Sequence, residues 1–315
     1  MQAYFWGARG SLPASTKAEQ IRGKIVAALQ AAQGQTFASV EALESFVDRN
    51  LPFAVRGAYG GNTACVEIKG GDAYVLCDAG TGLRDFGQSL APFDKPAVFH
   101  LFISHLHWDH IQGFPFFTPA FIPGNRIQIY GGHADLEKAF RQQQQPPFFP
   151  VPFQAMGAEI SFTVLETGKP YSIAGWTVQC LRQNHPGDSY GYAFERNGKK
   201  IVYSTDSEHK READSPFYPY LDFIRRADLL VFDAQYTLLD AMGVKENWGH
   251  SSNIVAVELS LAGLVKRLCL FHNEHTFDDA KLDQFLTDTR AFATLQDPTD
   301  PLEIFLAHDG LSITV

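Results

Sequence analysis

Four side chains that can bind a metal ion lie within six residues, immediately after an apolar segment. Residues 97–104 are apolar apart from one histidine and the final serine, and His105, His107, Asp109 and His110 follow them. Imidazole and carboxylate donors at this density favour a divalent transition metal such as zinc. Because their directions diverge in so short a loop, His105 and His107 can point one way, and Asp109 and His110 the other. The loop therefore predicts two metal sites rather than a polar turn.

A site for two metal ions needs further ligands, which we expect at the ends of other strands. His185, Asp206 and His272 follow apolar segments at 177–183, 200–204 and 267–271, each of which predicts a strand. Asp206 has two carboxylate oxygens and can bridge two cations. Taken singly, each of these residues could be a structural polar residue. Together with the loop they form a predicted ligand set: His105, His107, Asp109, His110, His185, Asp206 and His272.

The strand and helix signals along the chain predict an α/β protein with two sheets inside and helices outside. Helices are expected near 134–142, 252–264 and 278–292, and 142–152 is expected to be a loop because it is rich in proline. Residues 12–56 predict a helical insertion, with Ser39 as a helix N-cap. The insertion could be a lid, a dimer surface or an elaboration. No linker divides the chain, so residues 1–315 are predicted to form one domain. Strands are expected at 1–10, 63–68, 73–78, 97–104, 126–130, 159–165, 177–183, 191–196, 200–204, 228–233 and 267–272.

The composition narrows the classes of partner. The chain has 315 residues, of which 45% are hydrophobic and 19% charged, and its net charge is −9. An acidic chain is a poor general binder of nucleic acid or of anionic membranes. The four cysteines lie far apart, mostly in apolar segments, and predict reduced, buried thiols. With no signal peptide and no apolar segment near the ~18 residues of a membrane span, the predicted location is cytoplasmic.

This set of ligands resembles that of the metallo-β-lactamase superfamily. The resemblance covers nearly the whole chain and includes the turn Asp78-Ala79-Gly80. The resemblance implies an αββα sandwich, two mixed sheets flanked by helices, with a dinuclear site at the sheet edge. It assigns one ion to His105, His107 and His185, and implies that Asp78 supports a ligand histidine. The other ion falls to Asp109, His110 and His272, with Asp206 as the bridge and Asp109 counted also among the catalytic residues.

The segment Trp248-Gly249-His250-Ser251-Ser252 resembles the phosphodiesterase branch of that superfamily, to which ribonuclease Z and cyclic phosphodiesterases belong. The resemblance implies that His250 and Ser251 contact the substrate phosphate. It also implies that His250 assists the leaving oxygen as a catalytic residue and that Asp233 orients it. The chain departs from the usual pattern after His272, where Asn273, Glu274 and His275 stand.

The predicted function is metal-dependent hydrolysis of a small phosphodiester, a cyclic nucleotide or a related cyclic phosphate. Two divalent ions, zinc first with manganese or iron as alternatives, would generate a bridging hydroxide that attacks phosphorus, with His250 as general acid. The alternatives are a hydrolase of a lactone, thioester or β-lactam, a non-catalytic binding protein, and an endonuclease that processes the 3′ end of transfer RNA. The net charge of −9 disfavours the last of these. A homodimer is left open.

Other side chains could also lie near the site. His209 and His308 are candidates for its lining, and His275 for an exchange with His272 as ligand. Phe148, Phe149 and Phe153, in the proline-rich loop, could stack on a base, cover a sheet or form a dimer contact.

Overall fold

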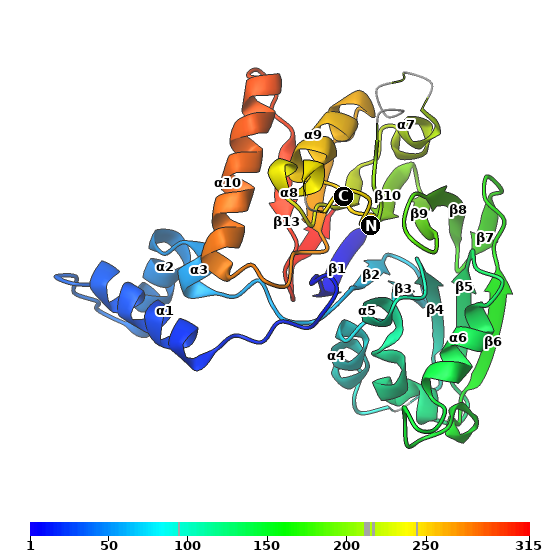
Figure 1. Cartoon of the computed structure of the whole chain (residues 1–315). Coiled ribbons are helices and arrows are strands. Elements are labelled where there is room, and N and C mark those ends of the chain that lie inside the picture. The colour runs from blue at the N-terminus through cyan, green and yellow to red at the C-terminus, as the bar shows by residue number, and fades with distance from the viewer. Residues whose placement is uncertain (94, 211–214, 216–217, 244) are drawn as a thin grey trace.

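Two seven-stranded sheets lie face to face in the computed structural model, which describes residues 1–315 except 94, 211–214, 216–217 and 244 (Figure 1). The first sheet has the order β14 (Ser312–Thr314), β1 (Gln2–Gly7), β2 (Cys65–Lys69), β3 (Tyr74–Cys77), β4 (Val98–Ile103), β5 (Arg126–Gly131) and β6 (Glu159–Val164). The second has the order β13 (Glu303–Leu306), β12 (Arg267–Phe271), β11 (Leu229–Asp233), β10 (Lys199–Ser204), β9 (Ser189–Arg196), β8 (Trp176–Gln183) and β7 (Tyr171–Ile173). The predicted pair of mixed sheets is confirmed.

Each sheet combines a parallel half with an antiparallel half. Strands β3 to β6 are parallel in the first sheet, and β10 to β13 are parallel in the second. Strands β2 and β3 pair antiparallel, as do β8 and β9. Parallel neighbours end at the same edge of a sheet, so the segments that follow β10 and β12 lie at one edge of the second sheet. The segment that follows β4, in the first sheet, meets them there, since His110 Nε2 lies 3.2 Å from His272 Nε2.

Helices cover the outer face of each sheet. On the first sheet lie α4 (Gly82–Ser89), α5 (Trp108–Ile111), α6 (Leu136–Gln143) and the 3₁₀ turns Phe114–Phe116, Thr118–Phe121 and Phe153–Ala155. On the second lie α7 (Pro219–Ile224), α9 (Asn253–Ala262) and α10 (Asp279–Gln296), and α8 (Leu238–Met242) contacts α9. Aromatic residues fill the space between the sheets: the Phe102 ring lies 5.4 Å from Tyr192 and 5.1 Å from Phe194.

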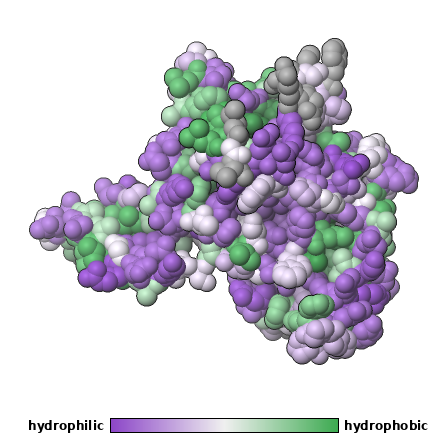
Figure 2. Space-filling view, viewed as in Figure 1, coloured by the Kyte–Doolittle hydropathy of each residue, from purple (hydrophilic) through white to green (hydrophobic). Residues whose placement is uncertain are grey.

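The predicted helical insertion forms α1 (Ala18–Ala31), α2 (Val40–Asn50) and α3 (Phe53–Arg56). Ser39 caps α2 as predicted, because its Oγ accepts the Ala42 amide at 3.3 Å. We call α1 and α2 the helical arm. The arm extends from the body beside α10 (Figure 1), and neither helix has a buried residue. Apolar side chains lie on its surface (Figure 2), among them Ile25 at 55% and Leu29 at 68% exposure.

The elements that the sequence did not predict are short. They include α4, which contains two glycines, and α7, α8, β7, β13 and β14, each of six residues or fewer. Too few periodic positions occur in such segments to distinguish them from loops. The predicted strand 63–68 begins later, at Cys65. All four cysteines are buried and free, as predicted. Among the described residues, no helix is both long and apolar enough to cross a membrane.

Candidate metal centre

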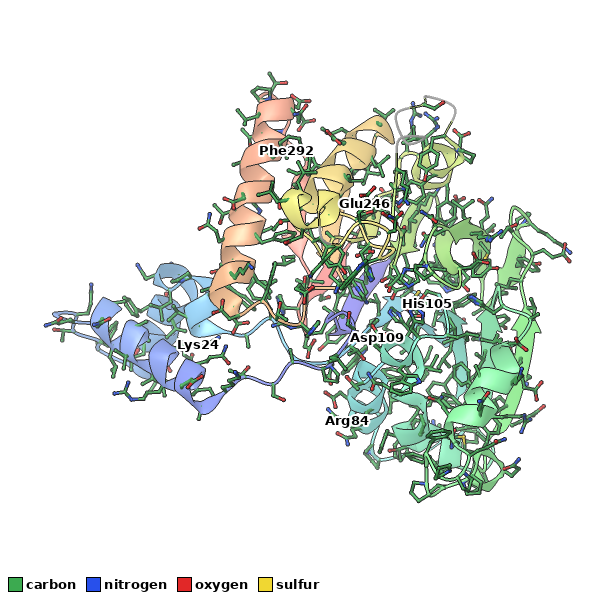
Figure 3. All side chains as sticks on the ribbon, in the orientation of Figure 1. Lys24, Arg84, His105, Asp109, Glu246 and Phe292 are labelled. Carbon is green, nitrogen blue, oxygen red and sulfur yellow. The ribbon has the colours of Figure 1, made fainter. Side chains whose placement is uncertain are left out.

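The predicted ligands meet at the edge where strands of both sheets end. His105, His107, Asp109 and His110 follow β4, His185 follows β8, Asp206 follows β10, and His272 follows β12. Figure 3 shows His105 and Asp109 in the middle of the molecule, between its two halves. Asp206 and His272 have φ of 47° and 62°, in the left-handed region that non-glycine residues seldom adopt. Strained backbone at both positions is typical of a functional site.

One group of donor atoms consists of nitrogens of His105, His107 and His185. His107 Nδ1 lies 2.9 Å from His105 Nε2 and 3.1 Å from His185 Nε2. Asp206 Oδ2 lies 3.5 Å from His105 Nε2 and 3.8 Å from His185 Nε2. A tetrahedral zinc site with bonds of ~2.0–2.1 Å places its ligand atoms ~3.3 Å apart. These four atoms therefore fit a divalent metal ion.

A second group is still more regular. Asp109 Oδ2 lies 3.2 Å from both His110 Nε2 and His272 Nε2, and the two nitrogens are themselves 3.2 Å apart. Asp206 Oδ1 lies 3.3 Å from each of those nitrogens. Asp206 thus offers one oxygen to each group. The structure brings together the two sets and the shared carboxylate that the resemblance implies.

Outer partners fix which nitrogen of each histidine faces the centre. His110 Nδ1 contacts Asp78 Oδ2 at 2.7 Å, which confirms that Asp78 supports a candidate ligand. His185 Nδ1 donates to the Gly249 carbonyl at 2.8 Å, and His272 Nδ1 donates to Gln235 Oε1 at 3.1 Å. Each of these three rings therefore turns Nε2, with its lone pair, toward the centre. Such a second set of contacts is typical of metal-binding histidines.

Burial favours neutral imidazole in the group formed by His105, His107 and His185. Burial lowers the pKa of His105 well below its usual value, and the nearby charge of His110 lowers it further. Burial and His185 likewise lower the pKa of His107. Burial would raise the pKa of Asp206, but the charges of His272, His110 and His105 outweigh it and hold the pKa well below its usual range. Neutral imidazole and ionised carboxylate are the forms that bind a metal ion.

The second group attracts positive charge. Burial would lower the pKa of His110, but Asp109, Asp206 and Asp78 surround the ring and raise the pKa well above its usual value. Burial would raise the pKa of Asp109, but the nearby His110 and His272 hold it below its usual value. A proton or a metal cation can supply the positive charge that these carboxylates favour. The donor set therefore suits a divalent cation.

His250 lies against both groups. Its ring stacks on His272 with centroids 5.0 Å apart, and its Nδ1 lies 3.0 Å from Asp233 Oδ2. Burial would lower the pKa of His250, but Asp233, by charge and hydrogen bond, raises it to about 9. Asp233 is fully buried and also accepts the Ser207 amide at 2.9 Å. The structure thus places Asp233 where it can orient His250.

Not every predicted residue faces the centre. The Ser251 hydroxyl donates to the Ser207 carbonyl at 2.5 Å, so it is engaged within the protein. His209 contacts Ser207 and Tyr218, and His308 packs on Phe53. His275 pairs with Glu274 at 3.1 Å and belongs to no described group of close donor atoms. Phe153 is buried against Phe114 and Phe162, so it cannot stack on a base.

Three supporting residues were not predicted. Gln235 holds His272, and the Tyr203 hydroxyl donates to Asp78 Oδ2 at 2.6 Å. The Ser11 amide donates to Asp109 Oδ2 at 2.8 Å. Tyr203 lies within β10 and Gln235 just after β11, and position near a strand end could have indicated both. No sequence signal marks Ser11, which lies far from the other residues along the chain.

Comparisons with known proteins agree with this architecture. A family model described as the beta-lactamase superfamily domain matches residues 73–273. A ribonuclease Z of Picrophilus torridus is 25% identical over 260 residues, which cover 66% of this chain and 78% of the relative. The metallo-β-lactamase fold protein YhfI of Bacillus subtilis superposes with a TM-score of 0.65 at 16% identity, over 99% of this chain and 98% of that one. A diphosphatase of the PhnP family superposes with a TM-score of 0.61 at 18% identity, over 100% and 97% of the two chains.

Two facing sheets with a histidine and aspartate cluster at their common edge define a hydrolase of the metallo-β-lactamase fold. The match over residues 73–273 shows that the chain belongs to the metallo-β-lactamase superfamily.

Proposed function

We propose that this protein is a dinuclear metal-dependent phosphodiesterase that acts on a small substrate, a cyclic nucleotide or a related cyclic phosphate. The observation that carries the proposal is the His250–Asp233 pair, 3.0 Å apart, beside two donor groups that share Asp206. A phosphodiester needs stabilisation of its phosphoryl oxygens and a proton for its leaving oxygen. Cations held by the two donor groups would stabilise the phosphoryl oxygens, and His250 would supply the proton.

The proposed metal ligands form the same two groups that the distances between donor atoms define. His105, His107 and His185 would hold one cation, and Asp109, His110 and His272 the other. Asp206 would hold both. Zinc fits the donor set, and manganese and iron are alternatives. When bound, two such cations supply Lewis acidity and lower the pKa of bound water toward neutrality.

The role that we propose for His250 follows from its hydrogen bonds. Its Nδ1 is held by Asp233, and His250 Nε2 makes no hydrogen bond within the described part of the chain. His250 Nε2 can therefore bear a proton and give it to the leaving oxygen, while Asp233 fixes the ring. Such general acid catalysis contributes typically ~10²–10⁴-fold to the rate. Asp109 would contribute to catalysis through the metal that it binds.

A second candidate function is the cleavage of precursor transfer RNA. The relative of Picrophilus torridus, 25% identical over 260 residues, bears the name ribonuclease Z. The net charge of −9 favours a small substrate instead, since a long RNA needs many cationic contacts along its backbone. A hydrolase of a carbon centre remains the third candidate, and the His250–Asp233 pair favours the diester over it.

A substrate panel tests the proposal. Purified protein loaded with zinc, manganese or iron would be assayed on bis(p-nitrophenyl) phosphate, cyclic nucleotides, precursor transfer RNA, lactones and β-lactams. We expect turnover of small diesters and little turnover of RNA. Cleavage of RNA without turnover of cyclic nucleotides would favour the second candidate, and lactone opening without diester turnover would favour the third.

A further inference from the structure

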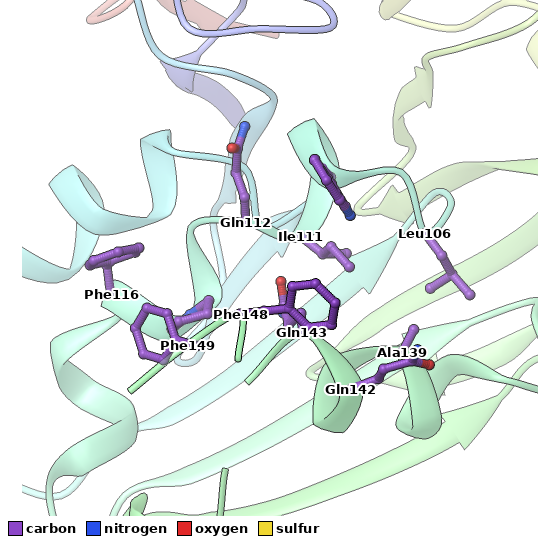
Figure 4. Close-up of a pocket in the computed structure, with 11 residues that line it drawn as sticks. Leu106, Ile111, Gln112, Phe116, Ala139, Gln142, Gln143, Phe148 and Phe149 are labelled. Carbon is purple, nitrogen blue, oxygen red and sulfur yellow. The ribbon is translucent and has the colours of Figure 1, made fainter. Parts of the chain in front are cut away.

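An aromatic groove adjoins the candidate metal centre. It has a volume of about 590 Å³ and lies between the loop after β4 and the end of α6 (Figure 4). Trp108, Phe116, Phe148 and Phe149 supply four aromatic rings to its lining. A cavity of ~300–1,000 Å³ with aromatic walls is typical of a site for a small molecule.

The groove and the metal centre share a wall. Leu106 and Trp108 line the groove, and they alternate along the chain with His105, His107 and Asp109. His107 is the solvent-exposed member of its donor group, and its neighbour Trp108 is 79% exposed. The exposed side of the metal centre, at His107, is therefore adjacent in the chain to the groove lining at Trp108. A ligand held at the centre by its phosphate could extend into the groove.

The lining indicates a neutral, planar occupant. Among the described residues that line the groove, none is charged, so it offers no positive charge to a phosphate. Trp108 and Phe148, at 79% and 72% exposure, present large rings to solvent that a flat ligand could cover. Phe116 and Phe149 are fixed against each other, edge to face, with centroids 5.4 Å apart.

Glutamine amides in the lining could bind the edge of such a ring. Gln112, Gln142 and Gln143 contribute to the wall. Gln143 Nε2 is buried, yet it has no hydrogen-bond partner among the described residues. A buried donor without a partner costs free energy, which a ligand acceptor would recover if the Gln143 side chain turned its amide into the groove. Ring nitrogens and carbonyl oxygens of a nucleobase are acceptors of this kind.

From these features we infer that the groove seats the base of a nucleotide whose phosphate lies at the metal centre. The inference rests on the proposed phosphodiesterase function and names its substrate class: nucleotide esters rather than cyclic phosphates without a base. Stacking on the aromatic rings and hydrogen bonds to the amides would supply the preference. A long RNA does not fit this groove equally well, because no cationic side chain follows its described lining.

Equilibrium binding tests the groove independently of catalysis. Adenosine 5′-monophosphate and ribose 5-phosphate would be titrated into the zinc-loaded protein by calorimetry. The two share the phosphate and the sugar and differ in the base. Removal of a stacking side chain typically weakens binding about 5- to 150-fold. We expect the wild type to prefer the adenosine compound by at least about tenfold, and Trp108→Ala and Phe148→Ala to lose most of that preference.

Controls separate this effect from a general one. Leu295→Ala removes another side chain of 79% exposure, on α10, and should leave the preference unchanged. Ribose 5-phosphate should bind equally to all variants. Equal affinity of the wild type for both ligands, or an unchanged preference in both groove variants, would overturn the inference.

Kinetics then separate the groove from the proposed function. The ratio of kcat/KM for 3′,5′-cyclic AMP to that for the same cyclic ribose phosphate without a base should fall in Trp108→Ala. If the wild type cleaves both substrates equally well, the phosphodiesterase stands and the groove does not. If no diester is cleaved but the binding preference persists, the groove stands and the proposed function fails.

Discussion

The candidate metal centre and the helical arm differ in the burial of their side chains. At the centre, Asp78, His110 and Asp233 have no exposed surface, and each has a hydrogen-bonding partner. In the arm, no residue of α1 or α2 is buried. The two sheets and the core between them therefore position the chemical site, whereas the arm adds exposed surface to the molecule. The segment that precedes the arm does reach the centre, because the Ser11 amide, seven residues before α1, donates to Asp109 Oδ2 at 2.8 Å.

The largest expected effect is at the carboxylate that joins the two donor groups. Asp206→Ala should reduce the metal content from about two ions per chain to one or fewer and abolish hydrolysis, because both groups lose an oxygen ligand. Elemental analysis of the purified variant measures this directly. Asp135→Ala, at an exposed carboxylate, is the matched control. Two ions retained by Asp206→Ala would contradict the proposed bridge.

His250→Ala should keep both ions but lower kcat by ~10²–10⁴-fold, since it removes a proton donor rather than a ligand. The loss should be smaller for p-nitrophenyl esters, whose leaving group needs little protonation. Steady-state rates on esters with a range of leaving groups measure this trend. Loss of metal, or an equal loss for every leaving group, would make His250 a ligand or a structural residue instead.

The outer contacts should have intermediate effects. Gln235→Ala removes the acceptor of His272 Nδ1 and should weaken metal binding by ~10–100-fold, without changing the ligands themselves. Competition with a chromophoric chelator measures the affinity. Gln145→Ala, at an exposed position, should leave it unchanged. An unaltered affinity in Gln235→Ala would show that the centre does not depend on this contact.

The smallest effect is expected in the arm. Ile25→Ser with Leu29→Ser should change the free energy of unfolding by about 0.5 kcal/mol or less, because both side chains are exposed. Phe102→Ala, between the sheets, should cost about 3–5 kcal/mol. Denaturant unfolding gives both values. A loss above about 1 kcal/mol in the arm variant would mean that another surface, such as a second copy of this chain, covers these residues.

Much of this architecture could be predicted because local patterns carried it. The apolar segment before His105 is long enough to identify β4, and the four donors after it identify the loop. Ser39 and the spacing of the apolar residues after it indicated where α2 begins. Short elements such as β7 and α7 were not predicted. A segment of less than two helical turns, or with fewer than two pairs of alternating positions, is too short to show a period.

Residue types at the carboxyl ends of the strands, and hence the kind of chemistry that is available, could be inferred from the sequence alone. The partners of these residues depend on the fold: Asp206 offers one oxygen to each group, Gln235 holds His272, and Ser251 is engaged with Ser207. The reason is physical. Periodicity and residue type are local properties of a chain, whereas a distance of 3.2 Å between His110 and His272, which are 162 residues apart, depends on how two sheets pack.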